Sequence, residues 1–375
     1  MPNAPTLPSL RMRHETARTG GSAARGALHA YGRKGNPMPN IMLTYRCNLR
    51  CPYCFANEFV NGRTDEITPE NFERALAFVT ARRPVHLGLI GGEPTLHPHF
   101  GEFLQRVIEH PRIASATVYT NGIRLNGFED LLAHPKLSLL VNWNPPGQIG
   151  ENAFGRIRGN VDTLVFERGM RGRVNLGLNL DGKDFDYGYM VDLLERYGLK
   201  KLRISLAVPN FPEGCGADVL EYFRGFKPFL LGLFARMDAI GVLPYYDCNR
   251  PPYCIWTPEE RQWIEAYVAR HSAPGDQEST LVNTKSFCRP VIDILPDLHA
   301  VRCFGMSFFE QVDIGRFPSL DELEAHFMRT IDRKAFRVHA APECDTCPLR
   351  RQWLCCQGCM GFKADEIGHE RGDSR

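Results

Sequence analysis

The sequence predicts an α/β protein built as a partial (β/α)6 barrel, followed by a small cysteine-rich domain. Two observations carry this prediction. From Ile41 to about residue 240, short apolar runs alternate with amphipathic stretches of helical length, and beyond that point cysteines accumulate instead. Such an alternation is typical of parallel strands joined by right-handed helical crossovers.

Six apolar runs are the strand candidates, and they are apolar on both faces, as buried parallel strands are. They are residues 41–45, 85–90, 116–119, 137–142, 174–180 and 202–208. Six strand–helix units are too few for a closed eight-unit barrel, so an open, TIM-like partial barrel is predicted. In such folds the chemistry lies at the C-terminal ends of the strands, on the loops that follow them.

Six amphipathic stretches are the helix candidates. They are residues 69–82, 99–110, 127–133, 152–169, 187–197 and 217–237. The clearest start is at Pro69, because Thr68 before it is a favoured N-cap and proline fits the first helical turn. Phe72, Leu76 and Val79 then repeat at helical spacing.

Length and composition indicate a globular chain of two domains preceded by a tail. The chain has 375 residues, of which 43% are hydrophobic and 23% charged. We expect the barrel over 38–240 and the cysteine-rich domain over 241–375. Residues 1–37 hold six basic residues against one acid without an apolar period. They predict a disordered basic tail, or a translation start placed too early, with a basic arm for an acidic partner as the alternative.

Charge and hydropathy exclude several classes of protein. The net charge of +2 gives no general basic field, so nucleic acid is not an expected partner. No apolar run is long enough to cross a bilayer, and the N-terminus lacks the apolar core of a signal peptide. We therefore expect a cytoplasmic protein without a membrane segment. In that reducing compartment clustered cysteines indicate metal ligands before disulfides.

Three of the 13 cysteines stand in one loop directly after the first strand. Cys47, Cys51 and Cys54 are separated by three and two residues. Structural zinc takes four ligands and an ordinary iron–sulfur cluster takes four cysteines, so three thiolates leave one position open. The loop alone allows a cluster with one iron free to bind a substrate or cofactor, or a zinc knuckle completed by a distant residue.

Polar and glycine-rich segments follow the other strands and are expected to line the same mouth. Each alone is explained by a turn or a cap, but the carboxyl ends of parallel strands bring them together. Glycines after the second strand would let a ligand approach the backbone. The segments are Gly91-Gly92-Glu93-Pro94, Thr120-Asn121-Gly122, Asn142 with Asn144, and Asn179 with Asp181.

Over about residues 40–210 these motifs resemble the radical S-adenosylmethionine (SAM) superfamily. The spacing Cys47-x3-Cys51-x2-Cys54, with Tyr53 before the last cysteine, matches its cluster motif. Gly91-Gly92-Glu93-Pro94 matches its second motif in the right strand position. The resemblance implies that the three cysteines hold a [4Fe–4S] cluster and that SAM chelates the fourth iron through its amino and carboxylate groups.

The same resemblance implies further contacts and a reaction. The backbone of Gly91 to Pro94 and the Glu93 side chain would receive the amino group of SAM, and Tyr53 would lie near the adenine. Asn121, Asn142 and Asn179 are candidates for ribose or carboxylate contacts. An electron from a donor such as flavodoxin or ferredoxin would cleave SAM to methionine and a 5′-deoxyadenosyl radical, which takes a hydrogen atom from the substrate. No side chain need act as acid or base in that step, so no catalytic side chain is assigned.

Beyond residue 240 a second cysteine pattern resembles the SPASM extension, which carries auxiliary [4Fe–4S] clusters. Three departures stand out: Leu298 replaces an expected glycine, one gap has seven residues where five are usual, and no cysteine follows Cys359. The pattern is Cys288-x14-Cys303 followed by Cys344-x2-Cys347-x7-Cys355-x3-Cys359.

One or two auxiliary clusters follow from this resemblance. The first would use Cys288, Cys303 and Cys359, with Cys254 or Cys248 as an upstream ligand. The second would use Cys344, Cys347 and Cys355, with Cys356 as the fourth ligand or an open position. A single cluster, as in the shortened twitch version, is one alternative. A zinc ribbon of Cys344, Cys347, Cys356 and Cys359 is the other. Cys215, in the loop after the sixth strand, is expected to be a free buried thiol.

Members with this extension often modify peptides or proteins by crosslinking, epimerisation or oxidation, so a peptide or protein is the first substrate expected. Since about 40 residues precede the barrel, leader recognition would call for a separate leader-peptide-binding protein. A small molecule, such as a sugar, nucleoside or cofactor precursor, is the second expectation. A non-catalytic zinc or iron–sulfur scaffold or electron carrier is the third.

Overall fold

The structure is a computed structural model, and it describes residues 39–54, 56, 59–60, 62–63, 65–207, 219–246, 248–272, 281, 288, 290–352, 355 and 357–363. All of these belong to one of the chain's two compact units, Pro37–Arg375. The predicted tail over 1–37, and the thiols of Cys215 and Cys356, lie outside the described residues.

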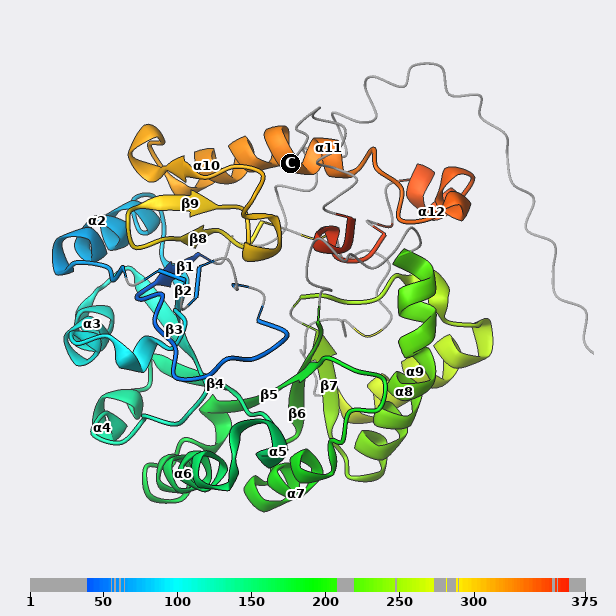
Figure 1. Cartoon of the computed structure of the whole chain (residues 1–375), viewed down its shortest axis with the longest axis horizontal. Coiled ribbons are helices and arrows are strands. Elements are labelled where there is room, and N and C mark those ends of the chain that lie inside the picture. The colour runs from blue at the N-terminus through cyan, green and yellow to red at the C-terminus, as the bar shows by residue number, and fades with distance from the viewer. Residues whose placement is uncertain are drawn as a thin grey trace, which may run out of the picture. The chain divides into compact units, whose positions relative to one another are not determined.

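A curved sheet organises this unit, with helices on its outer side (Figure 1). Seven of its strands run parallel and lie in sequence order. They are β1 (Asn40–Met42), β2 (Val85–Ile90), β3 (Ile113–Thr120), β4 (Leu137–Asn142), β5 (Val174–Leu180), β6 (Lys201–Leu206) and β7 (Leu243–Tyr246). The α/β fold class with a parallel, partial-barrel core is thereby confirmed.

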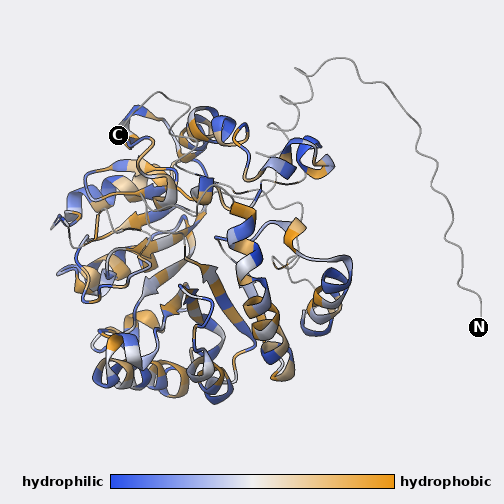
Figure 2. Ribbon diagram, turned by 45° about the vertical axis from the view of Figure 1, so that its right-hand side comes forward, coloured by the Kyte–Doolittle hydropathy of each residue, from blue (hydrophilic) through white to orange (hydrophobic). Residues whose placement is uncertain are grey.

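Amphipathic helices connect the strands, and Figure 2 shows them striped with hydrophilic and hydrophobic faces. Their apolar faces are buried, and neighbouring helices also pack on each other there, as in the stacked rings of Phe72 on α2 and Phe103 on α3, whose centroids lie 4.1 Å apart. The helices are α2 (Pro69–Val79), α3 (Phe100–Glu109), α4 (Glu129–Leu132), α5 (Pro146–Ile149), α6 (Glu151–Asp162), α7 (Gly188–Tyr197), α8 (Val219–Ala239) and α9 (Pro258–His271).

Strand β7 adds a seventh parallel strand to the six that the sequence predicts. Its sequence, Leu243-Pro244-Tyr245-Tyr246, contains a proline, which counts against a central strand. β7 lies at the end of the described sheet order, where it pairs with β6. An edge position tolerates proline because one side of the strand needs no ladder hydrogen bonds.

The cysteine-rich region extends the other edge of the sheet through three very short strands. β8 (Asp293–Ile294) runs parallel to β1, and β9 (His299–Val301) and β10 (Val312–Asp313) follow antiparallel. Asn40 on β1 donates from Nδ2 to Asp293 Oδ1 at 2.7 Å, with both side chains buried. Strands of two or three residues are too short to show an alternation of apolar and polar residues in the sequence. The boundary at 240/241 stays a prediction.

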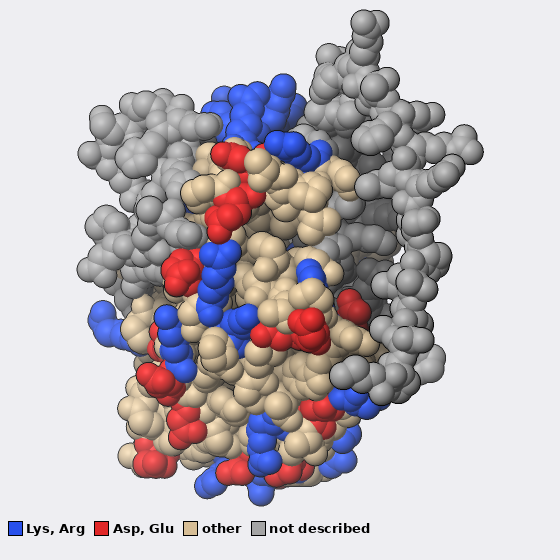
Figure 3. Space-filling view, turned by 90° about the vertical axis from the view of Figure 1, so that its right-hand side faces the viewer, with Lys and Arg blue, Asp and Glu red and all other residues tan. Residues whose placement is uncertain are grey.

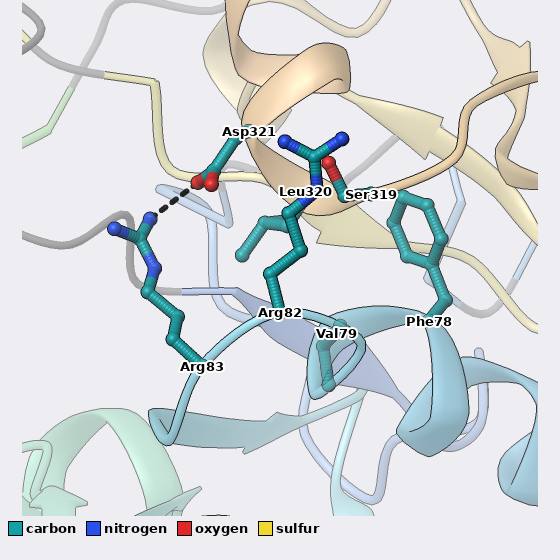
Figure 4. Close-up of a pocket in the computed structure, with 7 residues that line it drawn as sticks. All are labelled: Phe78, Val79, Arg82, Arg83, Ser319, Leu320 and Asp321. Atoms are coloured by element: carbon teal, nitrogen blue, oxygen red, sulfur yellow. Dashed lines mark hydrogen bonds and ion pairs between the residues drawn. The ribbon is translucent and has the colours of Figure 1, made fainter.

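Three further helices, α10 (Leu320–Phe327), α11 (Arg333–Ala335) and α12 (Pro348–Arg351), lie in the C-terminal region. α10 packs against the end of α2, where Arg83 Nη2 lies 2.6 Å from Asp321 Oδ1 (Figure 4). A small surface pocket there is lined by Phe78, Val79, Arg82, Arg83, Ser319, Leu320 and Asp321. It lies on the helical layer rather than at the strand ends where a barrel carries its site.

Acidic and basic side chains are interspersed on the face drawn in Figure 3. Several are paired elsewhere on the surface, such as Arg196 with Asp162 at 2.7 Å. Within the described part of the chain, no helix combines the length and the apolar character needed to cross a membrane.

Candidate active site

The cysteine loop after β1 and the glycine loop after β2 pack backbone to backbone at the C-terminal ends of their strands. The amide of Gly92 donates to the carbonyl of Thr44 at 2.8 Å, and that of Glu93 donates to Arg46 at 2.8 Å. A Cβ on Gly92 would lie 2.4 Å from the Arg46 carbonyl oxygen. Glycine is therefore required here because the chain's own cysteine loop approaches so closely, a reason that the sequence did not reveal.

The Glu93 carboxylate is fully buried and joins the loops after β2 and β3. Its Oε1 accepts from the Thr95 amide at 3.2 Å, the Thr95 hydroxyl at 2.7 Å and the Thr120 hydroxyl at 2.8 Å. Its Oε2 accepts from the Asn121 amide at 2.7 Å. Burial raises the pKa of Glu93, and these hydrogen bonds oppose that shift by favouring the carboxylate. The side chain thus fixes the frame of the site, and its contact with the amino group of SAM stays a prediction.

The three thiols of the cysteine loop are partly buried and interact electrostatically with one another. Cys47 has Glu93, Cys51 and Cys54 among its charged neighbours, and its Sγ accepts from the Leu49 amide at 3.4 Å. Burial is the largest cause that raises the pKa of Cys47 to about 11, and burial also raises that of Cys54. A metal cluster would reverse this balance, since its iron ions bind thiolates. The donor set therefore fits a cluster held by three thiolates.

Asn144 links the cysteine loop to the end of β4. Its Nδ2 donates to Cys51 Sγ at 3.3 Å, and its Oδ1 accepts from the Tyr53 hydroxyl. The Tyr53 hydroxyl also interacts with Asn179 at the end of β5. Burial is the main reason that the pKa of Tyr53 lies well above its ordinary value, so the phenol stays protonated and can donate.

The three asparagines predicted at the mouth differ in what they contact. Asn121 Nδ2 donates to Asn48 Oδ1 at 2.7 Å, which ties the β3 loop to the cysteine loop. Asn179 Oδ1 accepts from Arg203 Nη1 at 2.6 Å. Asn142 Oδ1 is buried and has no hydrogen-bond partner among the described residues, and its contact with a ligand group stays a prediction.

From sequence, Asn144 was expected at the mouth but was given no contact there, and Arg203 was not expected at the site at all. Asn144 follows Asn142 by two residues, so strand alternation places both on one face, and this was the available signal. Arg203 is a charged residue inside an apolar strand, which is unusual without a polar partner at the strand end.

Four thiols of the C-terminal region form a group that we call the first auxiliary group: Cys248, Cys288, Cys303 and Cys359. The Cys359 thiol is hydrogen-bonded to Cys248 and Cys288, which raises its pKa well above the ordinary value. Cys303 interacts electrostatically with Cys288 and Cys248, and burial raises its pKa. The structure thereby brings Cys248, rather than Cys254, to the other three.

A buried arginine lies against this group. Arg302 Nη1 lies 3.6 Å from Cys288 Sγ and 3.7 Å from Cys303 Sγ. Its Nη2 donates to the Cys288 carbonyl at 2.9 Å and to Asp332 Oδ2 at 3.1 Å. The hydrogen bond from Cys359 and the charge of Arg302 together hold the pKa of Cys288 well below its usual range. A cation beside two cysteines favours thiolate ligands.

A second set of thiols, Cys254, Cys344 and Cys347, interacts electrostatically. Desolvation of the sulfur raises the pKa of Cys344, which is buried, and that of Cys254, although the Cys254 residue as a whole is exposed. Cys355 accepts from the Gln357 amide at 3.2 Å.

Among the described residues, no three His, Cys, Asp or Glu side chains form a group suited to a single metal ion. Of the proposed zinc ribbon, Cys359 contacts the first auxiliary group, whereas Cys344 and Cys347 interact with Cys254.

The fold and this site define a radical SAM domain, and comparison with known proteins agrees. The family model of the Radical SAM superfamily matches residues 41–164, which contain the cysteine loop and the glycine loop. Residues 41–164 therefore form a Radical SAM domain, and proteins of that superfamily use a [4Fe–4S] cluster and SAM.

Among curated proteins, the chain is similar to two probable GTP 3′,8-cyclases. That of Methanocella arvoryzae is 28% identical over 224 residues, which is 58% of this chain and 62% of the relative. That of Thermococcus kodakarensis is 33% identical over 105 residues, which is 28% of this chain and 34% of the relative. The chain thus matches less than two thirds of the length of these relatives.

Two solved structures share the fold over most of the chain. The anSMEcpe structure with bound AdoMet and Cp18Cys peptide has a TM-score of 0.60 at 15% identity, and the match covers 89% of this chain and 96% of that one. Streptococcus suis SuiB bound to S-adenosylmethionine has a TM-score of 0.57 at 12% identity, with 94% and 79% covered. At such identities the likeness concerns the fold, which includes the cysteine-rich region.

Proposed function

We propose that this protein is an enzyme that cleaves SAM reductively and uses the resulting 5′-deoxyadenosyl radical to take a hydrogen atom from a peptide or protein. A [4Fe–4S] cluster with one open iron supplies this chemistry when SAM is bound to it. The observation that carries the proposal is the meeting of three mutually interacting thiols with the buried frame around Glu93.

The chain's own residues position and shield this chemistry. Cys47, Cys51 and Cys54 would hold the cluster, and Asn144 fixes the Cys51 sulfur through its hydrogen bond of 3.3 Å. The backbone of Gly91 to Pro94 would bind the amino group of SAM, and the Tyr53 side chain faces the ends of β4 and β5. Ligand contacts by Asn121, Asn142 and Asn179 belong to this proposal.

The substrate class is argued from the cysteine-rich region. Structures with bound peptides, anSMEcpe with Cp18Cys and SuiB with the precursor peptide SuiA, share the fold over 89% and 98% of this chain. The match to the Methanocella arvoryzae cyclase covers only 58% of the chain. Likeness that extends over nearly the whole chain favours a peptide. We further propose that an electron donor such as flavodoxin or ferredoxin reduces the cluster. A separate protein would bind the leader peptide, and the enzyme would act in the cytoplasm.

The second candidate is a small-molecule substrate, and the curated GTP 3′,8-cyclases favour it. The two candidates differ in what accelerates SAM cleavage. A nucleotide such as GTP would raise the yield of 5′-deoxyadenosine and be consumed under the second, and would leave the yield unchanged under the first. The non-catalytic scaffold predicts no SAM cleavage at all.

The test uses the full chain, reconstituted anaerobically with iron and sulfide and reduced in the presence of SAM. The expected product is 5′-deoxyadenosine, measured by chromatography and mass spectrometry. Cys51→Ala should abolish it, whereas the surface substitution Asp321→Asn leaves the three thiols of this loop intact and should still cleave SAM. If the wild-type protein binds its clusters and forms no 5′-deoxyadenosine, the proposal fails.

A further inference from the structure

The segment between Cys248 and Cys254 lies between two separate sets of thiols. Cys248 comes two residues after β7, and Cys254 lies in a short helical turn, Tyr253–Ile255, ahead of α9. Cys248, a thiol of the first auxiliary group, is therefore only six positions before Cys254, which interacts with Cys344 and Cys347.

The Cys248 end is fixed by a sharp turn. Asn249 has φ of 53°, in the left-handed region that asparagine tolerates better than most residues. Its side chain donates from Nδ2 to the Ser205 hydroxyl at 3.2 Å, on β6. Cys248 is thereby held beside Cys359, with which it shares a hydrogen bond.

The Cys254 end is fixed by contacts with α8 and with the turn Pro342–Asp345, which carries Cys344. Arg224 on α8 interacts with Cys254 and forms an ion pair with Glu343 at 3.1 Å. Because Glu343 directly precedes Cys344, this pair places the Cys344 turn beside the same arginine that interacts with Cys254. The Cys347 amide donates to the Cys344 carbonyl at 3.4 Å, which keeps the second thiol of that turn beside the first.

The middle of the segment contains two prolines and packs against Gly358, which directly precedes Cys359. Pro251 and Pro252 are buried, and proline fixes its own φ. Gly358, with φ of +88°, packs on them so closely that a Cβ there would lie 3.3 Å from both the Arg250 carbonyl oxygen and Pro252 Cδ. Gly358 therefore rests on the segment.

We propose that this segment supplies one thiolate to each of two auxiliary clusters. Cys248 completes the first auxiliary group, and Cys254 is the fourth ligand of a second cluster held by Cys344, Cys347 and Cys355. The inference rests on the proposed function for the presence of auxiliary clusters, and it assigns Cys254 as the fourth ligand of the second cluster, where the sequence left open Cys356 or none. With four protein thiolates, the second cluster has no iron open to substrate and suits electron transfer.

The test compares Cys254→Ala with Cys356→Ala in a background where Cys47, Cys51 and Cys54 are all alanine, so that the iron measured is auxiliary iron only. The full chain is reconstituted with ⁵⁷Fe and sulfide. About eight irons are expected for the parent, since each cluster holds four. Cys254→Ala should lower this number or convert one cluster to a three-iron form, seen by Mössbauer and electron paramagnetic resonance spectroscopy. Cys356→Ala should leave the iron content and both spectra unchanged.

Two outcomes would overturn the inference. One is full iron content with an unchanged spectrum in Cys254→Ala, together with loss of a cluster in Cys356→Ala. The other is a parent with about four irons, which means one auxiliary cluster. These readouts need no SAM cleavage, so they are separate from a failure of the proposed function, which is the absence of 5′-deoxyadenosine from the wild-type protein.

Discussion

Arg302 and Asp332 form an ion pair in which both side chains are fully buried, and the same guanidinium faces two cysteine thiols. Burying two charges is unfavourable unless they are well paired and hydrogen-bonded. Here the pair has a second purpose, since Asp332 holds a positive charge within 3.7 Å of Cys288 and Cys303. The arrangement links the stability of the C-terminal region to the ligand set of the first auxiliary group.

Replacing Arg302 by methionine should destabilise the cluster-free protein strongly. The substitution leaves the Asp332 carboxylate buried without its cation, and breaking a buried pair in this way typically removes about 3–5 kcal/mol. The measurement is the urea midpoint of the reduced, iron-free chain. Arg82→Met is the matched control, because its partner Glu322 is exposed at 3.4 Å and such pairs contribute about 1 kcal/mol or less. Equal effects of the two substitutions would contradict this account.

Arg302 should also raise the reduction potential of the first auxiliary cluster. Hydrogen bonds and positive charge beside cluster sulfurs favour the reduced, more negative state. We expect Arg302→Met to lower the midpoint potential by on the order of 50 mV, with Arg302→Lys in between because it keeps the charge. A redox titration followed by electron paramagnetic resonance measures it. A potential that stays the same in both variants would show that Arg302 is only structural.

Asp293 should make stability fall as pH rises from about 4 to about 7. Burial raises the pKa of Asp293 to about 7, against the hydrogen bonds from Asn40 and the Phe304 amide, whereas an unfolded aspartate titrates near 3.9. Between these values the folded chain binds the extra proton, so raising the pH favours unfolding, by up to about 4 kcal/mol. Asp293→Asn should remove this slope from urea midpoints measured across that range, and the surface substitution Asp321→Asn should leave it in place.

The barrel was predictable because its strands are long enough to show a pattern. The ends of β2, β4 and β5 fall at the residues that the sequence predicts. The parts that escaped prediction depend on tertiary contacts. β8 has two residues and becomes a strand only by pairing with its neighbours β1 and β9, as Asp293 opposite both Asn40 and Val301 shows. The division of Cys248 and Cys254 between two groups likewise follows from the turn at Asn249, which spacing alone does not reveal.

Tyr53 and Asn144 should act as one unit beside the cysteine loop. Tyr53→Phe removes the hydroxyl that Asn144 accepts from, but leaves the bond from Asn144 Nδ2 to Cys51 Sγ in place. Asn144→Leu removes both hydrogen bonds, the one from the Tyr53 hydroxyl and the one to Cys51 Sγ. We therefore expect a small loss of SAM cleavage in Tyr53→Phe, and in Asn144→Leu a larger loss together with a lower potential of the cluster in this loop. The double variant should behave like Asn144→Leu, and additive losses would show that the two residues act separately.

Glu93→Gln should weaken the hydrogen bonds that join the loops of the active site, even though glutamine has nearly the same shape as glutamate. The carboxylate accepts from Thr95 and Thr120 on one oxygen and from the Asn121 amide at 2.7 Å on the other. Glutamine has one acceptor oxygen, so its NH₂ group must face a donor on one side, at a loss of about 1–3 kcal/mol.

Because the Glu93 amide also anchors the cysteine loop at Arg46, the Glu93→Gln variant should retain less iron at Cys47, Cys51 and Cys54. The measurement is iron content and thermal midpoint in a background whose auxiliary cysteines are replaced by alanine. Glu66→Gln is the matched control, since Glu66 bonds the same loop through the Thr44 hydroxyl at 3.3 Å from a partly exposed position. Loss of iron in Glu66→Gln but not in Glu93→Gln would place the anchor of the loop at Glu66 instead.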